Sequence, residues 1–271
     1  YAPIIPFLGF KPDLSPTLQR VVSFEDHSNS LYFGNPIILA AGANKTAKRI
    51  ADYANLGFGG ITVGTATRNP RSGNTHKPRI GFLENERAIH NSMGLNNDGI
   101  EAIAARVDEQ LIRSHKKGLC VGVSVAETPG LTNENEKIDD ILDCFTQAYK
   151  VGDYIEVNVS CPNTGENRLD LDTRFSETIF SEIMRLRNTL GVRKAVFAKL
   201  SPDLSLRGLQ TLLDVISKYG VNGVVLGNTF PTSKMDVLPV KATWDSLTPL
   251  RADGDKGGLS GRPLYENMFQ N

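Results

Sequence analysis

The residues best suited to chemistry lie at 158–167, directly after the apolar run Tyr154–Val157, which we predict to be a buried strand. A thiol, Cys161, stands there between two carboxamides, Asn158 and Asn163, and the intervening proline turns the chain away from the strand. Carboxamides can bind a planar ligand through paired donors and acceptors, and a thiolate can act as a base or nucleophile. Such a cluster at a strand's carboxyl end is typical of α/β-barrel active sites.

Lysines mark two further strand ends. Lys45 follows the predicted strand at 36–41 and can neutralise an anionic ligand, although a solvated lysine at the start of a helix is the alternative. Lys199 lies in the apolar strand at 195–200, where an unpaired charge is costly, and this favours a functional role. For Cys161, a role as base or nucleophile is favoured over that of a buried, inert cysteine, because it lies at a strand end among polar groups. Cys120 and Cys144 are instead placed inside a strand and a helix.

Amides, hydroxyls and glycines recur at other strand ends. Glycine lets a backbone approach a flat ligand closely, but Asn and Gly are also ordinary turn residues. The stretch at 257–264 has the pattern of a glycine-rich loop that opens a helix, whose N–H groups suit an anion. The remaining polar stretches lie at 42–45, 64–67, 73–79, 91–99 and 227–229.

Composition narrows the class of protein. The chain has 271 residues, is 40% hydrophobic and carries no net charge, which indicates one globular domain and no nucleic-acid footprint. Three widely spaced cysteines argue against a disulfide framework and for a reducing compartment, and four scattered histidines argue against a zinc site. No apolar segment reaches the roughly 20 residues that span a bilayer.

Alternating apolar runs predict an α/β fold. Continuous Val and Ile runs indicate strands buried on both faces, hence a parallel sheet covered by helices. A doubly wound sheet is the alternative, but polar groups at many strand ends favour a (β/α)8 TIM barrel. The predicted strands are 36–41, 60–64, 120–125, 154–159, 195–200 and 223–226, and the predicted helices are 46–56, 98–117, 138–151, 176–190 and 206–219.

The expected organisation is an N-terminal arm at 1–30 and a barrel domain at 31–271. We count six β/α units, so we expect the last two units, with the phosphate site that barrels often build from them, to be missing. The apolar, Pro-rich start of the arm is expected to pack on the barrel, with docking to a membrane as the alternative.

Taken in order, these strand ends resemble the dihydroorotate dehydrogenases, FMN-dependent barrel enzymes of pyrimidine (UMP) biosynthesis. The resemblance runs from about residue 35 to 264 and implies oxidation of dihydroorotate to orotate. The matching stretches are Ala40-Ala41-Gly42 with Lys45, Gly64-Thr65-Ala66-Thr67, Asn91 to Gly94, Asn158-Val159-Ser160-Cys161-Pro162-Asn163, Lys199, Asn228-Thr229 and Gly257-Gly258-Leu259-Ser260-Gly261.

The resemblance also implies roles for residues. Cys161 would take the C5 proton of dihydroorotate while hydride leaves C6 for the flavin. The implied substrate-binding residues are Lys45, Asn91, Ser92, Met93, Gly94, Leu95, Asn158, Asn163, Asn228 and Thr229. The implied FMN-binding residues are Ala41, Gly42, Lys45, Thr65, Ser124, Asn158, Lys199, Gly227 and Gly261.

The electron acceptor implied by the resemblance is a quinone, because the loops after the second strand and at 257–264 are similar to those of the quinone-using class. That class normally has serine in place of Cys161 and asparagine in place of Ser124, and cysteine belongs to the class that reduces fumarate or NAD. We expect a cytoplasmic protein, with peripheral contact at the inner membrane as an alternative. The oligomeric state is left open.

Two rival functions stay open at this point. One is another FMN barrel reductase of pyrimidines, acting on a dihydropyrimidine or on dihydrouridine; the absence of net charge disfavours a tRNA substrate. The other is a flavin-free barrel remnant that binds a small ligand without catalysis.

Overall fold

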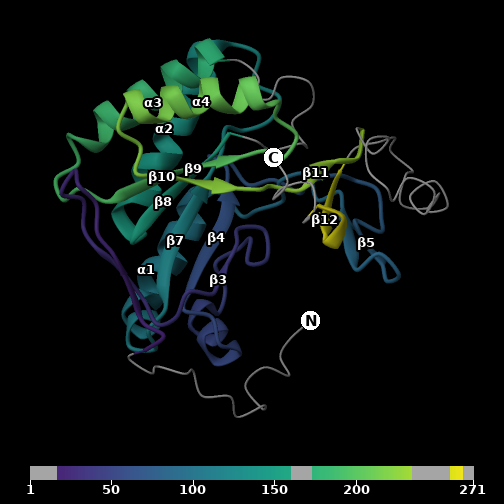
Figure 1. Cartoon of the computed structure of the whole chain (residues 1–271), viewed down its shortest axis with the longest axis horizontal. Helices are drawn as coiled ribbons and strands as arrows, with labels where there is room; N and C mark the ends of the chain where they lie inside the picture. The colour runs from purple at the N-terminus through teal and green to yellow at the C-terminus, as the bar shows by residue number, and fades with distance from the viewer. Residues whose placement is uncertain (1–16, 160–172, 234–256, 265–271) are drawn as a thin grey trace.

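A parallel sheet forms the centre of the protein. The computed structural model describes residues 17–159, 173–233 and 257–264, and its largest sheet has six strands, all parallel (Figure 1). In spatial order they are β10 (Gly223–Leu226), β9 (Ala195–Leu200), β8 (Tyr154–Asn158), β7 (Cys120–Val125), β4 (Gly60–Ala66) and β3 (Ile38–Leu39). Sequential parallel strands lie side by side without the order reversal of a doubly wound sheet, so the predicted barrel fold is confirmed as a partial barrel.

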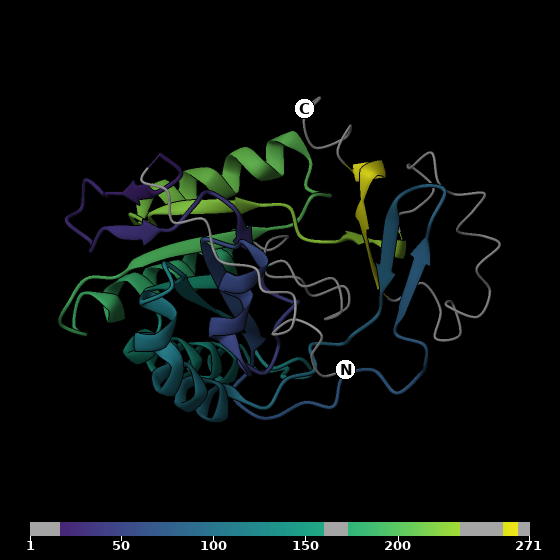
Figure 2. The same cartoon turned by 90° about the horizontal axis from the view of Figure 1, so that it is seen from below.

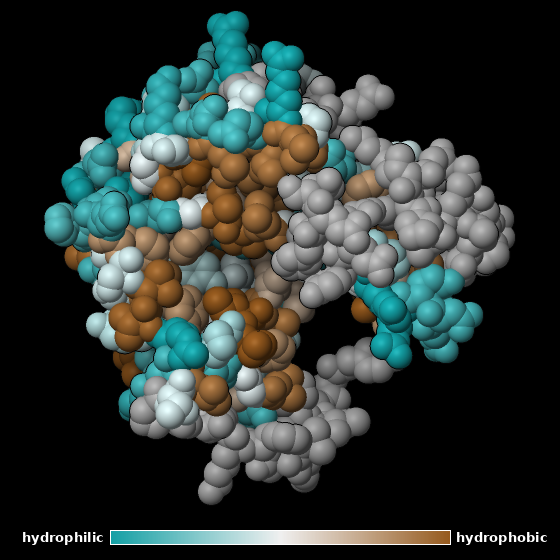
Figure 3. Space-filling view, in the orientation of Figure 1, coloured by the Kyte–Doolittle hydropathy of each residue, from teal (hydrophilic) through white to brown (hydrophobic). Residues whose placement is uncertain are grey.

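Helices cover one face of this sheet (Figure 1). They are the 3₁₀-helix η2 (Ile50–Leu56) and the α-helices α1 (Ile100–His115), α2 (Glu134–Val151), α3 (Thr173–Arg187) and α4 (Leu206–Lys218). Successive strand residues point to opposite faces, so Val121, Val123 and Val125 of β7 enter the apolar core beneath the helices and are fully buried. In the space-filling view the helices turn hydrophilic residues outward and apolar residues gather beside them (Figure 3). None of the described helices is long and apolar enough to cross a membrane.

The other face of the sheet changes character along the strands. At the amino ends it is apolar, where the hairpin of β1 (Arg20–Val22) and β2 (Leu31–Phe33) packs Leu31 and Phe33 against Cys120 and Tyr154. Towards the carboxyl ends the inward positions become polar and charged, as at Ser124 and Glu156. The apolar layer therefore supports a polar layer, which is where a ligand can be recognised.

A small antiparallel sheet stands beside the carboxyl ends of the parallel strands (Figures 1 and 2). Its order is β11 (Phe230–Pro231), β12 (Gly258–Gly261), β6 (Ala88–Asn91) and β5 (Ile80–Leu83). The sequence interpretation missed this sheet and was wrong to place 258–261 in a glycine-rich loop. That segment is a strand because β6 and β11 pair with its backbone on either side, which no local pattern reveals.

Two predicted elements near the start of the barrel are shorter than expected. The helix predicted at 46–56 is the 3₁₀-helix η2, because Ala47 and Arg49 take left-handed backbone angles, with φ of 54° and 56°, which interrupt a helix. The strand predicted at 36–41 is reduced to β3, at the edge of the sheet. Before it, the Asn35 side chain accepts a hydrogen bond from the Ile37 N–H and holds the chain in a turn.

A partly buried ion pair anchors the β1–β2 connection to the barrel. Arg187, at the end of α3, places Nη1 2.8 Å from Asp26 Oδ2 and 3.0 Å from Asn222 Oδ1. Asn222 Nδ2 donates back to Asp26 Oδ1 at 3.0 Å, and Ser28 donates through its N–H and its hydroxyl. Burial alone would raise the pKa of Asp26, but the hydrogen bonds from Ser28, Arg187 and Asn222 outweigh it and lower the pKa from 3.8 to about 2.

This lowered pKa predicts an acid-sensitive stability. A carboxyl with a lower pKa in the folded state stabilises the fold above its unfolded pKa, and the contribution is lost as the pH falls towards the folded pKa. We expect acid titration of the unfolding free energy to show a loss of ~2 kcal/mol between about pH 4 and 2 that is absent in Asp26→Asn. Glu25→Gln, at the exposed neighbour, should leave that loss in place; equal profiles for wild type and Asp26→Asn would contradict the assignment.

Candidate active site

Hydroxyls and carboxamides meet at the carboxyl ends of the parallel strands. Thr65 Oγ1 lies 2.9 Å from Ser124 Oγ, and Asn158 Nδ2 donates to Thr65 Oγ1 at 3.1 Å. Asn228 Nδ2 donates to Asn158 Oδ1 at 3.4 Å. We call these four residues the polar network. It draws on β4, β7, β8 and the segment after β10, and its first three members are buried, so it is organised rather than solvated.

The backbone around Gly64 requires glycine. Gly64 has a φ of +103°, and a Cβ there would lie 2.6 Å from the Ser124 carbonyl oxygen. Its N–H donates to the Asn44 carbonyl at 2.9 Å, and its own carbonyl accepts from the Gly42 N–H at 2.8 Å. These bonds hold the loop after β3, with the predicted ligand residues Ala41, Gly42 and Lys45, beside Thr65 of the polar network.

Two buried charges lie next to the polar network. Lys199 pairs in register with Asn158, and Glu156 pairs in register with Ser124. The Lys199 Nζ is 3.8 Å from Glu156 Oε1, and their side chains are only 6% and 2% exposed. The predicted functional lysine therefore has an acidic neighbour inside the barrel. The sequence interpretation missed Glu156 because it grouped 154–157 as one apolar run, although polar residues alternate there.

The small sheet carries the other predicted substrate residues towards the network. Asn91, at the end of β6, donates from Nδ2 to the Gly258 carbonyl at 3.3 Å. A side chain at Gly258 would collide with Thr229, so these residues are in direct contact. Thr229 N–H donates to Asn228 Oδ1 at 2.9 Å, which joins the chain of contacts to Asn158. The predicted residues from both sheets are thus connected.

The loop after β6 returns to the parallel sheet. Asn74 Nδ2 donates to the Ser92 hydroxyl at 3.0 Å and to its carbonyl at 3.1 Å. Leu95 packs on Ala126, directly after β7, and is buried with it. Ser92, Met93, Gly94 and Leu95 therefore span the distance between the small sheet and the carboxyl end of β7.

A buried histidine lies next to Asn91. His90 is fully buried in β6, paired in register with Leu259 of β12. Burial, and to a smaller extent the nearby His76, lowers the pKa of His90 to about 4. His90 is therefore neutral near pH 7, and the small sheet adds no cationic charge to the site through this residue.

One predicted residue within the described part of the chain lies away from the network. Gly261 lies at the far end of β12, opposite Ala88, three residues beyond Gly258 in the same strand. Cys161 and Asn163 fall outside the described residues, although Asn158 precedes them by only a few positions. Gly227, with a φ of +95°, turns the chain from β10 towards Asn228 and Thr229.

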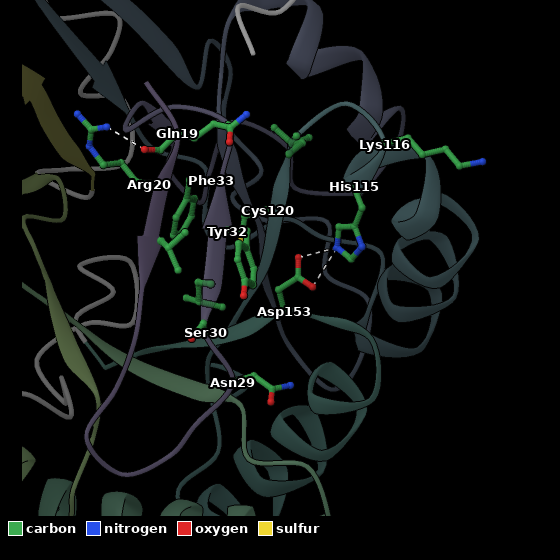
Figure 4. A pocket seen from close by; sticks show the side chains of 15 residues that line it. Gln19, Arg20, Asn29, Ser30, Tyr32, Phe33, His115, Lys116, Cys120 and Asp153 are labelled. Atoms are coloured by element: carbon green, nitrogen blue, oxygen red, sulfur yellow. Dashed lines mark hydrogen bonds and ion pairs between the residues drawn. The ribbon is translucent and has the colours of Figure 1, made fainter. Parts of the chain in front are cut away.

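A cavity of about 560 Å³ lies at the opposite, amino ends of the strands (Figure 4). In it His115 Nε2 lies 2.9 Å from Asp153 Oδ2, and the hydrogen bond to Asp153 raises the pKa of His115. Burial raises the pKa of the Cys120 thiol, which keeps it protonated and unreactive. His115 and Asp153 pair with each other and the Cys120 thiol is inert, so catalysis is better placed at the carboxyl ends.

Comparison with known proteins gives one consistent family. The sequence matches the family described as Dihydroorotate dehydrogenase over residues 25–270. The "Dihydroorotate dehydrogenase (quinone)" of Polynucleobacter asymbioticus is 32% identical over 255 residues, which cover 91% of this chain and 70% of that protein. The protein of the same name from Coxiella burnetii is 34% identical over 243 residues, covering 88% of this chain and 65% of that protein.

Solved structures agree with the sequence relatives. The crystal structure of ligand-free DHODH from Eimeria tenella aligns with a TM-score of 0.78 at 27% identity and covers 97% of this chain and 73% of that one. This chain thus spans between 65% and 73% of the length of the proteins compared. With a family match over most of its length and the strand-end arrangement described above, the chain belongs to the dihydroorotate dehydrogenase family.

Proposed function

We propose that this protein oxidises dihydroorotate to orotate in pyrimidine biosynthesis, with FMN as cofactor and a quinone as electron acceptor. The observation that carries the proposal is the continuous chain of contacts from Asn91 through Gly258, Thr229 and Asn228 to Asn158. Carboxamides held on two facing elements offer paired donors and acceptors, which suit the amide groups and carboxylate of a planar pyrimidine. Lys45 would supply the countercharge for the carboxylate.

The residues at the strand ends fit a flavin ring. Gly42 has open space where a side chain would stand, and Thr65, Ser124 and Asn158 supply hydroxyl and amide groups at the neighbouring strand ends. Lys199 adds a buried cation, which suits the pyrimidine edge of a flavin, where negative charge collects on reduction. Ala41, Gly227 and Gly261 complete the proposed FMN contacts. When bound, FMN would supply the acceptor for the electron pair that leaves the substrate.

The proton chemistry is assigned to Cys161. A thiolate in the segment that follows β8 would remove the C5 proton, and Asn158 and Asn163 would bind and orient the ring. The unperturbed pKa of a thiol is about 8.5, so the rate should rise with pH until the thiolate predominates.

The electron acceptor is inferred from the relatives and from two residues of this chain. The relatives named above are quinone enzymes, and this supports a quinone for this chain. Cys161 resembles the soluble enzymes instead, and Ser124 departs from the asparagine of the quinone class, so fumarate and NAD are the alternatives. We further propose a cytoplasmic location with peripheral contact at the inner membrane, an arm at 1–30 and an FMN-binding barrel at 31–271.

Anaerobic titration tests this function. Dihydroorotate added to the purified flavoprotein should bleach the flavin absorption band and release orotate. A ubiquinone analogue should then restore the band faster than fumarate or NAD at equal concentration. Flavin that remains oxidised in the presence of saturating dihydroorotate, but is bleached by a dihydropyrimidine, would instead identify a different pyrimidine reductase.

A further inference from the structure

The buried pair of Glu156 and Lys199 lies in the polar layer of the barrel, and the proposed chemistry leaves Glu156 without a role. Both charges lie on central strands, and their side chains are almost fully shielded from water. Glu156 Oε1 has no hydrogen-bond partner among the described residues. Its closest charged neighbour there is the Lys199 ammonium at 3.8 Å, which is longer than a hydrogen bond.

Such a pair is a poor device for stability alone. Moving two charges out of water is unfavourable, and their mutual attraction offsets this desolvation only when the geometry is good and further hydrogen bonds are made. A protein with an apolar pair of similar volume in their place is often equally stable. The layer below contains an uncharged pair instead, because Tyr154 and Thr62 share a hydrogen bond of 2.7 Å and neither side chain carries a charge. The charged pair therefore calls for a functional explanation.

The position of the Glu156–Lys199 pair indicates a role at the ligand site. Lys199 stands opposite Asn158 in the sheet, and Glu156 stands opposite Ser124, so the pair borders two residues of the polar network. The ammonium has three protons, and the distance to Glu156 leaves them available for hydrogen bonds to a ligand. Glu156 lies two residues before Asn158 on the same strand face, so it approaches Lys199 from the inside of the barrel.

We propose that Glu156 is a positioning residue that holds the Lys199 ammonium at the flavin site and offsets its charge, thereby lowering the redox potential of the bound flavin. This inference rests on the proposed function. A cation stabilises the reduced, negatively charged flavin more than the oxidised flavin and so raises the potential, whereas a carboxylate beside the cation weakens that effect. The pair would thus set how readily the flavin accepts electrons from substrate and passes them on.

Redox titration of the holoenzyme tests this role. Glu156→Gln removes the charge and keeps the shape, so the Lys199 charge is no longer offset. We expect this variant to favour reduced over oxidised flavin about tenfold more than wild type, which is ~30 mV upward for a two-electron couple. Glu156→Asp retains the charge and should stay closer to wild type. Tyr154→Phe, the matched control on the same strand face, should leave the potential unchanged.

The outcomes separate the inference from the function on which it rests. A wild-type protein whose flavin dihydroorotate does not reduce would contradict the proposed function. A wild type that reacts, with an unchanged or lower potential in Glu156→Gln, would overturn the role of Glu156 alone. If Glu156→Gln loses its flavin while Glu156→Asp keeps it, the charge is what the site requires, which supports the inference; loss from both variants would contradict it.

Discussion

Replacing Cys161 with alanine is expected to slow flavin reduction by dihydroorotate by about 10²- to 10⁴-fold, the range that general bases contribute. The flavin should remain bound, because the proposed FMN contacts lie on other residues. Cys161→Ser should be intermediate and should move the pH profile upward, since a hydroxyl keeps its proton to a much higher pH than a thiol. Stopped-flow measurement of flavin bleaching across pH, without oxygen, gives both the rate of flavin reduction and its pH dependence.

Cys144 provides the matched control for this experiment. It is fully buried in α2, within the apolar core between the helices and the sheet, and burial raises the pKa of its thiol. Cys144→Ala should cost some stability but leave the rate and its pH profile unchanged. Wild-type kinetics in Cys161→Ser would remove Cys161 from the base role and direct attention to another group at the end of β8.

The centre of the barrel could be predicted because burial dictates its sequence. The strands predicted at 120–125, 195–200 and 223–226 have the same bounds in the structure, since each is a short, mainly apolar run that ends before a turn or loop. The sheet order follows from the same pattern, because consecutive strands of a barrel are neighbours. Helix bounds differ by a few residues, as for α2, which begins four residues before the predicted start at 138.

The small sheet could not be predicted, because its strands obtain their partners from distant parts of the chain. β11 has two residues, and the Gly-Leu-Ser-Gly segment of β12 has little intrinsic preference for a strand. Its strand geometry comes from pairing with β6, far earlier in the sequence. Contacts between predicted site residues, such as Thr229 with Gly258, depend on that pairing and were equally invisible.

The candidate site was likewise predictable only in part. Polar residues at strand ends were recognisable, because parallel strands bring their carboxyl ends to one edge. Glu156 was missed, although the alternation of Tyr154, Glu156 and Asn158 with apolar residues indicates one face that is not covered by helices. A charge at such an inward position needs a partner, and the search for that partner would have led to Lys199.

The Glu156–Lys199 pair also predicts the largest effect on stability. Lys199→Met is expected to lower the free energy of unfolding by ~3–5 kcal/mol, because it leaves the Glu156 carboxylate buried without a countercharge. Denaturant unfolding of the flavin-free and flavin-bound protein measures the loss. Lys194→Met, just before the same strand, is the matched control. The Lys194 ammonium donates to the Tyr149 carbonyl at 2.7 Å, so this substitution leaves no buried charge without a partner and should lower the free energy of unfolding by about 1 kcal/mol.

Double replacement shows whether the charge itself is responsible. Adding Glu156→Gln to Lys199→Met removes the stranded carboxylate, so part of the lost stability should return, although the second substitution also removes a native residue. Simple addition of the two single effects would mean that the charges do not interact across their 3.8 Å separation. The double variant should regain stability without regaining flavin bleaching by substrate. That result would separate the two roles of Lys199, because an uncharged pair can restore the stability of the core but cannot supply a positive charge at the flavin site.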